Sequence, residues 1–271
     1  MKPFLKYVGG KTWLIPQFQS LTTDVLTNET VLVELFCGSG AISLGLEHPN
    51  VILNDVNRSL MQLWHNIQEG KTPKLISCPD SKFYAETRDA FNLIKDDVII
   101  QKDTIDVNAG DLYYFLNKFA FNGLYRENKK GKFNASWNNA TKSIEIDWEC
   151  YQSLIAKWEL HNQNFIDVSI PDNALIYADP PYDDTFANYS KGGFNFTQQE
   201  NLALHLSNLA KKGIPIIASN SWTERIVNLY ENLGFAVLSA HAPRRISCDG
   251  NRDDAKEMIA HINLHHGNVN D

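Results

Sequence analysis

Short apolar runs alternate with helical patterns along most of this chain, and this alternation restricts the folds open to it. The predicted strands are the apolar runs at 31–36, 51–53, 174–178, 214–218, 235–238 and 258–262. Helical patterns begin near Ala41, at the Thr197 and Glu200 capping box, and near Thr223. Such βαβ units form a parallel sheet whose helices cover both faces. We therefore predict a mostly parallel α/β sheet.

The stretch from about 56 to 157 interrupts this rhythm. It has helical patterns at 59–68, 82–94 and 111–119, and then becomes polar and aromatic from 121 to 148. We predict a helix-rich subdomain at 57–157, inserted between the two parts of a catalytic domain at 1–56 and 158–271.

Composition excludes several classes of protein. With 271 residues, 43% of them hydrophobic and 21% charged, the chain can bury a core like an ordinary globular protein. No apolar run reaches membrane-spanning length, and the first residues lack a secretory signal. The four cysteines are far apart, so we expect no metal site, no disulfide framework and a reducing, cytoplasmic compartment.

The charge distribution allows a local nucleic-acid contact. The net charge of −7 argues against general affinity for nucleic acid. Between Lys118 and Lys142, however, six basic residues face the single acid Glu127, a net charge of +5. This segment is either a basic binding patch or a solvated loop.

Asp179-Pro180-Pro181-Tyr182 follows the apolar run 174–178, at the end of a predicted strand, where ligands of open α/β sheets bind. The prolines stiffen the backbone, the carboxylate accepts hydrogen bonds from an amine, and the tyrosine offers a flat face for stacking. The four residues can hold a planar amino group, or they form a strand-terminating turn.

Two further segments indicate a cofactor. The loop with Gly38 and Gly40 follows the first strand, but a dinucleotide fingerprint needs a third glycine where the chain has Ser43. Asp55 ends the second strand, where a carboxylate can bind both ribose hydroxyls. A ribose without a pyrophosphate favours S-adenosylmethionine over a nicotinamide cofactor.

The N-terminal segment 6–11 adds a tight turn at Gly9 and Gly10. Tyr7 can stack on a purine there, and Lys11 can pair with a carboxylate or a phosphate. The alternative is an unstructured start that leads into a helix.

Four blocks, at 4–11, at 34–40 with Asp55, at 121–126 and at 179–182, together resemble the Dam-type family of DNA adenine-N6 methyltransferases. A weaker match lies at 194–197. The resemblance spans nearly the whole chain. It implies a Rossmann-like S-adenosylmethionine methyltransferase sheet with an inserted DNA-recognition subdomain, and methylation of a flipped adenine in double-stranded DNA.

The resemblance also implies roles for individual residues. The catalytic residues would be Asp179, Pro180, Pro181 and Tyr182. Asp179 and the Pro180 carbonyl would hold the adenine amine, and Tyr182 would stack on the flipped base. The cofactor pocket would include Tyr7, Gly9, Gly10, Lys11, Glu34, Phe36, Gly38, Gly40, Asp55 and Asp179. The DNA would be contacted by Lys6, Asn122, Leu124, Arg126, Asn134, Arg244 and Arg245.

One segment departs from the family pattern. After Phe133-Asn134 the family commonly continues with Pro, Gly and a basic residue, whereas this chain has Ala135-Ser136-Trp137. Because that segment helps to choose bases, GATC is only the default target. We expect a monomer in solution, with more than one copy allowed on DNA.

Three alternatives stay open. They are a methyltransferase for an amine of RNA or protein, a DNA-binding relative that has lost catalysis, and a nicotinamide dehydrogenase. The last leaves Asp179 to Tyr182 without a role.

Overall fold

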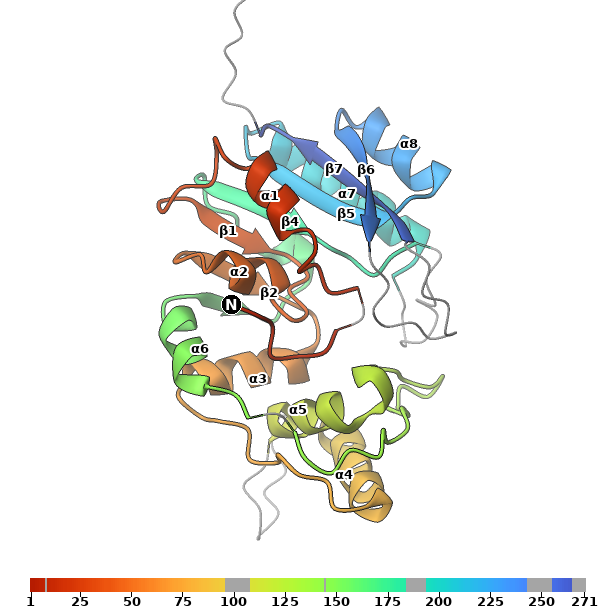
Figure 1. Ribbon diagram of the computed structural model, residues 1–271. Coiled ribbons are helices and arrows are strands. Elements are labelled where there is room, and N and C mark those ends of the chain that lie inside the picture. Colours follow the sequence, from red (N-terminus) through yellow and green to blue (C-terminus); the bar gives the residue numbers. More distant parts are fainter. Residues whose placement is uncertain (8, 96–107, 144, 184–193, 243–254, 265–271) are drawn as a thin grey trace, which may run out of the picture.

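A seven-stranded sheet organises the described part of the chain (Figure 1). The computed structural model describes residues 1–7, 9–95, 108–143, 145–183, 194–242 and 255–264. The strands lie in the order β3-β2-β1-β4-β5-β7-β6. Their bounds are β1 Val31–Glu34, β2 Val51–Asn54, β3 Glu159–His161, β4 Ala174–Ala178, β5 Ile216–Ser221, β6 Ala236–Ala242 and β7 Ala255–Ile262. β1 to β5 pair in parallel, and β7 runs antiparallel to β5 and β6. The predicted mostly parallel sheet is confirmed.

The strand order creates a topological switch point at the carboxyl edge of the sheet. From β1 the chain passes to β2 on one side, while β4 pairs with the other side of β1. At such a switch point the following loops diverge and leave room for a ligand. The loops after β1, β2 and β4 carry the glycines, Asp55 and Asp179, so all three reach the same edge.

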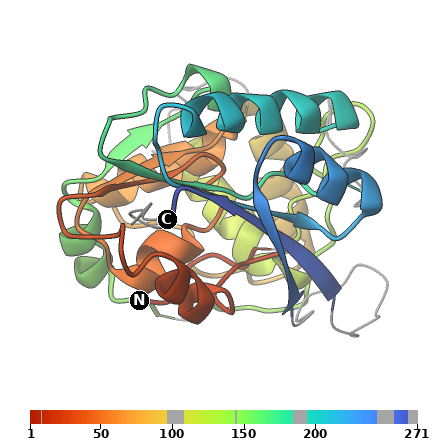
Figure 2. The same cartoon turned by 90° about the horizontal axis from the view of Figure 1, so that it is seen from above.

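Helices cover both faces of the sheet (Figure 2). One face holds α1 and α2, and the other holds α7 and α8, in two separate hydrophobic clusters. Leu32 and Leu175 point to the first cluster, Val33 and Ile176 to the second, as the two-residue period of a strand requires. The bounds are α1 Ile15–Leu21, α2 Ala41–Leu46, α7 Phe196–Ala210 and α8 Glu224–Asn232.

Between β2 and β3, the described residues form four helices and a 3₁₀ turn. They are α3 Arg58–Gln68, α4 Ser81–Ile94, α5 Ala109–Phe119, η1 Phe121–Gly123 and α6 Trp148–Ile155. Figure 1 shows α3, α4 and α5 gathered below the sheet. α5 crosses closely over α3, since a Cβ on Gly110 would lie 2.7 Å from the Leu63 nitrogen. The three predicted helices of this stretch are confirmed, and the domain boundaries at 57 and 157 stay a prediction.

Some local predictions were wrong. The capping box of α7 uses Asn195 and Gln198 rather than Thr197 and Glu200, because the helix begins two residues earlier than predicted. Sequence patterns missed the short edge strand β3, helix α6 and the 3₁₀ turn η2 (Phe165–Asp167). Pro215 lies just before β5, where its carbonyl accepts a hydrogen bond from the Ile176 N–H at 3.0 Å and its missing N–H costs nothing.

The described residues include neither a membrane-spanning helix nor a metal-binding cluster. We find no helix there whose length and hydropathy would suffice to cross a bilayer. We also find no group of three or more His, Cys, Asp or Glu side chains in that part of the chain that could bind a metal ion.

A buried tyrosine in α8 offers a test of the core. The Tyr230 hydroxyl is buried and has no hydrogen-bond partner within the described part of the chain. Because an unsatisfied buried hydroxyl costs free energy, we expect Tyr230→Phe to keep the free energy of unfolding or raise it by about 1 kcal/mol. Urea denaturation measures this. Tyr177→Phe is the control, since it removes a 3.0 Å contact with the Ser219 hydroxyl. A large loss of stability in Tyr230→Phe would show a missed partner.

Candidate active site

Lys11 connects the N-terminal segment to the end of β4. Its side chain is only 3% exposed, and Nζ lies 3.1 Å from Asp179 Oδ2 and 3.7 Å from Glu257 Oε2. Nζ also donates to the carbonyl of Gly9, which has a φ of +77°. Gly9 lies in a turn that is closed by a hydrogen bond from the Gly10 N–H to the Tyr7 carbonyl. A turn that glycine permits therefore places a cation beside the carboxylate of the Asp-Pro-Pro-Tyr segment.

The Asp179 carboxylate is held at both oxygens. Oδ2 faces Lys11, and Oδ1 accepts a 2.6 Å hydrogen bond from the Ser219 hydroxyl on β5. The Tyr177 hydroxyl lies 3.0 Å from the same Ser219 oxygen. Asp179 remains 21% exposed, so the carboxylate is oriented and yet open to a ligand.

Tyr182 lies against the same charged groups. Its hydroxyl donates a 2.6 Å hydrogen bond to Glu257 Oε2, and Lys11 Nζ lies 4.7 Å from the centre of its ring. Burial, with the nearby Asp179 and Glu257 carboxylates, raises the pKa of Tyr182 well above its usual value. The phenol therefore stays protonated and acts as a donor.

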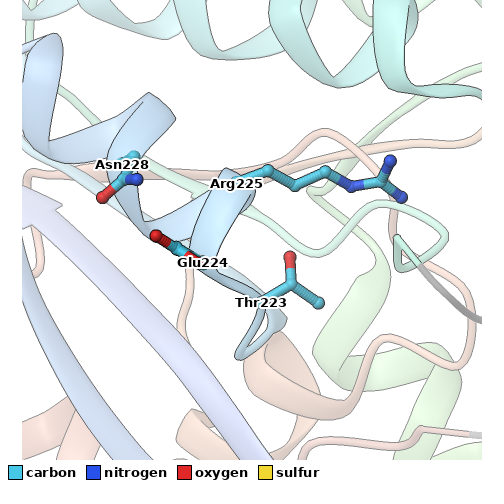
Figure 3. Close-up of a pocket in the computed structure, with 4 residues that line it drawn as sticks. All are labelled: Thr223, Glu224, Arg225 and Asn228. Atoms are coloured by element: carbon cyan, nitrogen blue, oxygen red, sulfur yellow. The ribbon is translucent and has the colours of Figure 1, made fainter.

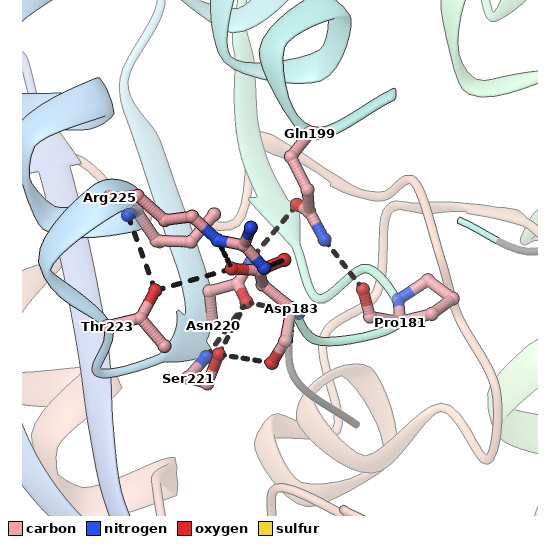
Figure 4. A network of polar contacts seen from close by, with 8 residues as sticks. Pro181, Asp183, Gln199, Asn220, Ser221, Thr223 and Arg225 are labelled. Carbon is pink, nitrogen blue, oxygen red and sulfur yellow. Dashed lines mark hydrogen bonds and ion pairs between the residues drawn. The ribbon is translucent and has the colours of Figure 1, made fainter. Parts of the chain in front are cut away.

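A second polar network fixes the backbone after the two prolines (Figure 4). The Gln199 side chain donates to the Pro181 carbonyl at 2.8 Å and accepts from Asn220 at 2.9 Å. Asn220 accepts from the Asp183 N–H at 3.2 Å, and the buried Asp183 carboxylate pairs with Arg225 of α8. Contacts from β5, α7 and α8 thus support the segment that carries Tyr182.

On the other side of Asp179, Asp55 organises the glycine loop. Its Oδ2 accepts from the Gly38 N–H at 3.1 Å and its Oδ1 from the Asn57 N–H at 2.9 Å. Burial raises the pKa of Asp55, and these two hydrogen bonds oppose the rise. Gly38 has a φ of +48°, and a Cβ there would lie 2.8 Å from Tyr7 Cε1. Glycine therefore allows both the turn and the close approach of the Tyr7 ring.

Two further residues predicted for the cofactor pocket lie under this loop. Glu34 accepts hydrogen bonds from the Ser43 N–H at 2.7 Å and from the Ser43 hydroxyl, at the start of α2. Burial raises the pKa of Glu34 to about 7, although both hydrogen bonds lower it. The Phe36 ring is partly buried against Phe165 and Phe194, at centroid distances of 5.4 and 5.6 Å. Glu34 supports α2, whereas Phe36 borders an aromatic group.

Lys6 is attached to the region that carries the predicted DNA contacts. Its N–H donates to Asn117 Oδ1 at 3.0 Å, and Asn117 Nδ2 donates back to the Lys6 carbonyl at 2.6 Å. A Cβ on Gly123 would lie 2.5 Å from the Lys6 Cβ. Lys6 thus lies beside η1, next to the exposed Asn122 and the half-buried Leu124.

Arg126 and Asn134 face each other across a short hairpin. Arg126 Nε donates to Asn134 Oδ1 at 2.8 Å, and its Nη2 donates to the Asn134 carbonyl at 3.1 Å. Both residues flank an antiparallel bridge between Glu127 and Phe133. The side chains at the tip are basic and exposed at Lys129, Lys130 and Lys132. Arg244 and Arg245 lie outside the described residues.

An open hollow of about 410 Å³ lies elsewhere, at the start of α8 (Figure 3). It is lined by Thr223, Glu224, Arg225 and Asn228. Its Arg225 turns toward the Asp183 network and not toward Lys11. We therefore regard it as separate from the candidate active site.

Sequence patterns did not identify Ser219, Glu257, Gln199 or the Asp183–Arg225 pair. Ser219 and Glu257 lie within strands and belong to no motif. The only signal for them is a polar side chain inside an otherwise apolar strand, such as Ser219 and Asn220 in β5.

Comparisons with known proteins agree with this geometry. Residues 7–246 match the family model for D12 class N6 adenine-specific DNA methyltransferases. The Type II methyltransferase M.MjaIII of Methanocaldococcus jannaschii is 31% identical, over 93% of this chain and 95% of its own. The Retron Ec67 DNA adenine methylase of Escherichia coli and the DNA adenine methylase of Salmonella typhimurium are each 28% identical, over 96% of this chain and 91% and 94% of theirs. This chain belongs to the D12 class of N6 adenine-specific DNA methyltransferases.

Proposed function

We propose that this methyltransferase moves a methyl group from S-adenosylmethionine to N6 of an adenine flipped out of double-stranded DNA, at GATC or a related short site. The observation that carries the proposal is the Asp179 carboxylate, oriented by Lys11 and Ser219 at the switch point between β1 and β4. Relatives named DNA adenine methylase support the Dam-like target.

The side chains at this switch point fit the methyl donor. Each Asp55 oxygen accepts one backbone N–H, and a carboxylate oxygen can accept a second hydrogen bond from a ribose hydroxyl. Tyr7 offers an aromatic face beside Gly38. Gly9 and Gly40 have positive φ, and a Cβ on Gly10 would lie 3.3 Å from the Tyr7 carbonyl oxygen. S-adenosylmethionine, when bound, supplies an electrophilic methyl group.

The chemistry that falls to the protein is to make the adenine amine nucleophilic. The nitrogen lone pair of this amine is delocalised into the purine ring. Asp179 and the Pro180 carbonyl can each accept one N–H of the amine, which fixes its geometry and stabilises the positive charge that develops on nitrogen. A new N–C bond then forms as the S–C bond breaks, and alignment of the two reactants lowers the barrier further. Tyr182 would stack on the extruded base and offset part of the few kcal/mol that unstacking costs.

We propose that residues 57–157 form the target-recognition subdomain. Lys6, Asn122, Leu124, Arg126 and Asn134 would contact the DNA, with Leu124 as a wedge and Arg126 as a base reader. The basic tip of the hairpin at 129–132 would contact phosphates, and Arg244 and Arg245 would add charge from the late loop. Binding should then weaken steeply with salt, because phosphate contacts release counterions.

We further propose a monomer that acts in the cytoplasm, where its DNA substrate lies, with more than one copy able to bind one DNA. Sedimentation of the free protein and of its DNA complex measures both states. A stable dimer without DNA would contradict this part of the proposal.

A transfer assay tests the function. We expect tritium from labelled S-adenosylmethionine to enter duplex DNA, and not RNA or protein. Mapping N6-methyladenine in a treated genomic library would then give the target sequence. Label in RNA or protein would favour another amine substrate, and cofactor binding without transfer would favour a decayed enzyme.

Arg126→Ala tests base reading. We expect it to relax the choice of base at one position of the site and to cost about 1–3 kcal/mol of discrimination there. Asn134→Ala should do the same more weakly, because Asn134 orients the guanidinium. Rates on a set of single-base variants of the site measure the effect. Lys130→Ala is the control, and a loss in Arg126→Ala that is equal for all sequences would make Arg126 a phosphate contact.

A further inference from the structure

Glu257 occupies an unusual position for an acid. It lies on β7 opposite Ser221 of β5 and Ala240 of β6, at the carboxyl edge of the parallel strands. Its side chain is 8% exposed. Because burying a carboxylate is costly unless it is paired, its partners indicate why it is there.

The partners of Glu257 are two residues of the candidate active site. Oε2 accepts the 2.6 Å hydrogen bond from Tyr182 and lies 3.7 Å from Lys11 Nζ. Lys11 in turn contacts Asp179 at 3.1 Å. Side-chain contacts therefore link Glu257 directly to Tyr182 and Lys11, and through Lys11 to Asp179.

The charges of this group matter for the reaction. One ammonium is shared between two carboxylates, so the three ionised side chains carry a net charge of −1. An ammonium paired with Asp179 alone would neutralise it and weaken it as an acceptor. Glu257 attracts Lys11 as well, and thereby leaves negative potential at Asp179 for the positive charge that develops on the amine.

The hydrogen bond to Tyr182 adds a geometric effect. A phenol ring that is held only at its Cβ can tilt, whereas a second attachment at the hydroxyl restricts it. Lys11 lies over the same ring at 4.7 Å, so the position of the ring and that of the ammonium depend on each other. A residue of β7, Glu257, thus fixes the orientation of the Tyr182 ring face that is proposed to stack on adenine.

We propose that Glu257 is a positioning residue for methyl transfer, which acts through Tyr182 and Lys11 rather than by contact with the substrate. This inference rests on the proposed function, since it assumes that adenine is held at Asp179 and Tyr182. It predicts that Glu257 affects the rate of the chemical step and not the affinity for substrates.

Glu257→Gln separates charge from shape, because the amide can still accept the tyrosine hydrogen bond. We expect its single-turnover rate at saturating DNA and S-adenosylmethionine to fall about 10-fold, less than the 10²–10³-fold loss typical of a direct contact. The KM for both substrates and the melting temperature should stay near those of the wild type. Glu231→Gln, an exposed acid on α8, is the matched control and should keep the wild-type rate.

Glu257→Leu and Tyr182→Phe test the route through the tyrosine. If Glu257 acts partly through the hydroxyl, the effects of the two changes on the rate must be non-additive in the double variant. Additive effects would remove Tyr182 from the proposal.

The possible failures are distinguishable. Wild-type rates in Glu257→Gln, or a loss that disappears when rates are divided by the fraction of folded enzyme, overturn the inference while the enzyme remains active. An inactive wild-type enzyme overturns the proposed function itself.

Discussion

Asp179→Ala should abolish methyl transfer while duplex DNA still binds. Removing one preorganised electrostatic contact to the reacting group typically costs 10²–10³-fold in rate, and Asp179 is the proposed acceptor for the adenine amine. Lys11 holds one of its oxygens and Ser219 the other. The loss should appear in the single-turnover rate, with DNA affinity unchanged, because the predicted DNA contacts lie on the hairpin and on η1.

Two companions make the experiment sharp. Asp179→Asn keeps the size of the side chain and should lose nearly as much activity. That result would show that the charge and the acceptor oxygens of Asp179 matter more than its packing. Ser219→Ala keeps the carboxylate and removes only its 2.6 Å hydrogen bond, so about a 10-fold loss is expected. The three variants should melt near the wild-type temperature, because Lys11 keeps Glu257 as a partner in each. Measured melting temperatures therefore exclude unfolding as the cause of lost activity. Near-normal turnover of Asp179→Ala would refute the site.

Trp64→Ala should have the largest effect on stability, about 3–5 kcal/mol. Trp64 on α3 is 0% exposed, and its ring packs against Phe4 and Trp158 at centroid distances of 4.9 and 6.4 Å. It also supports the glycine loop: its Nε1 donates to the Gly38 carbonyl at 3.4 Å, and a Cβ on Gly40 would lie 2.9 Å from its Cζ2. Affinity for S-adenosylmethionine should therefore fall together with stability.

Denaturant unfolding and cofactor titration of the folded enzyme measure the two effects separately. Trp64→Phe is the matched control, because it keeps an aromatic ring in the core and loses the indole N–H. Trp64→Phe should be more stable than Trp64→Ala. It should still lose part of the cofactor affinity that Trp64→Ala loses, because the indole N–H is absent in both. A cofactor affinity that is unchanged in both variants would mean that the glycine loop keeps its shape without Trp64.

Much of the fold could be predicted because its signals are local. The apolar run at 174–178 ends at Asp179, and the run at 51–53 ends next to Asp55, so each strand and its terminal carboxylate are read from a few neighbouring residues. The helical patterns of 59–68, 82–94 and 111–119 became α3, α4 and α5 for the same reason. Short elements such as β3 were missed, because three residues at a sheet edge are too few to show a period.

By itself, the sequence determined the order of most strands and helices, the family, and the side chains at the ends of β1, β2 and β4. Only the tertiary structure decided which distant side chains complete the site. Glu257 lies 75 residues from Tyr182 in the chain and contacts it only because β7 enters the sheet antiparallel beside β5. Ser219 and Lys11 meet at Asp179 for a similar reason. Local patterns report how a segment folds, whereas contacts between strands depend on the order in which the sheet assembles them.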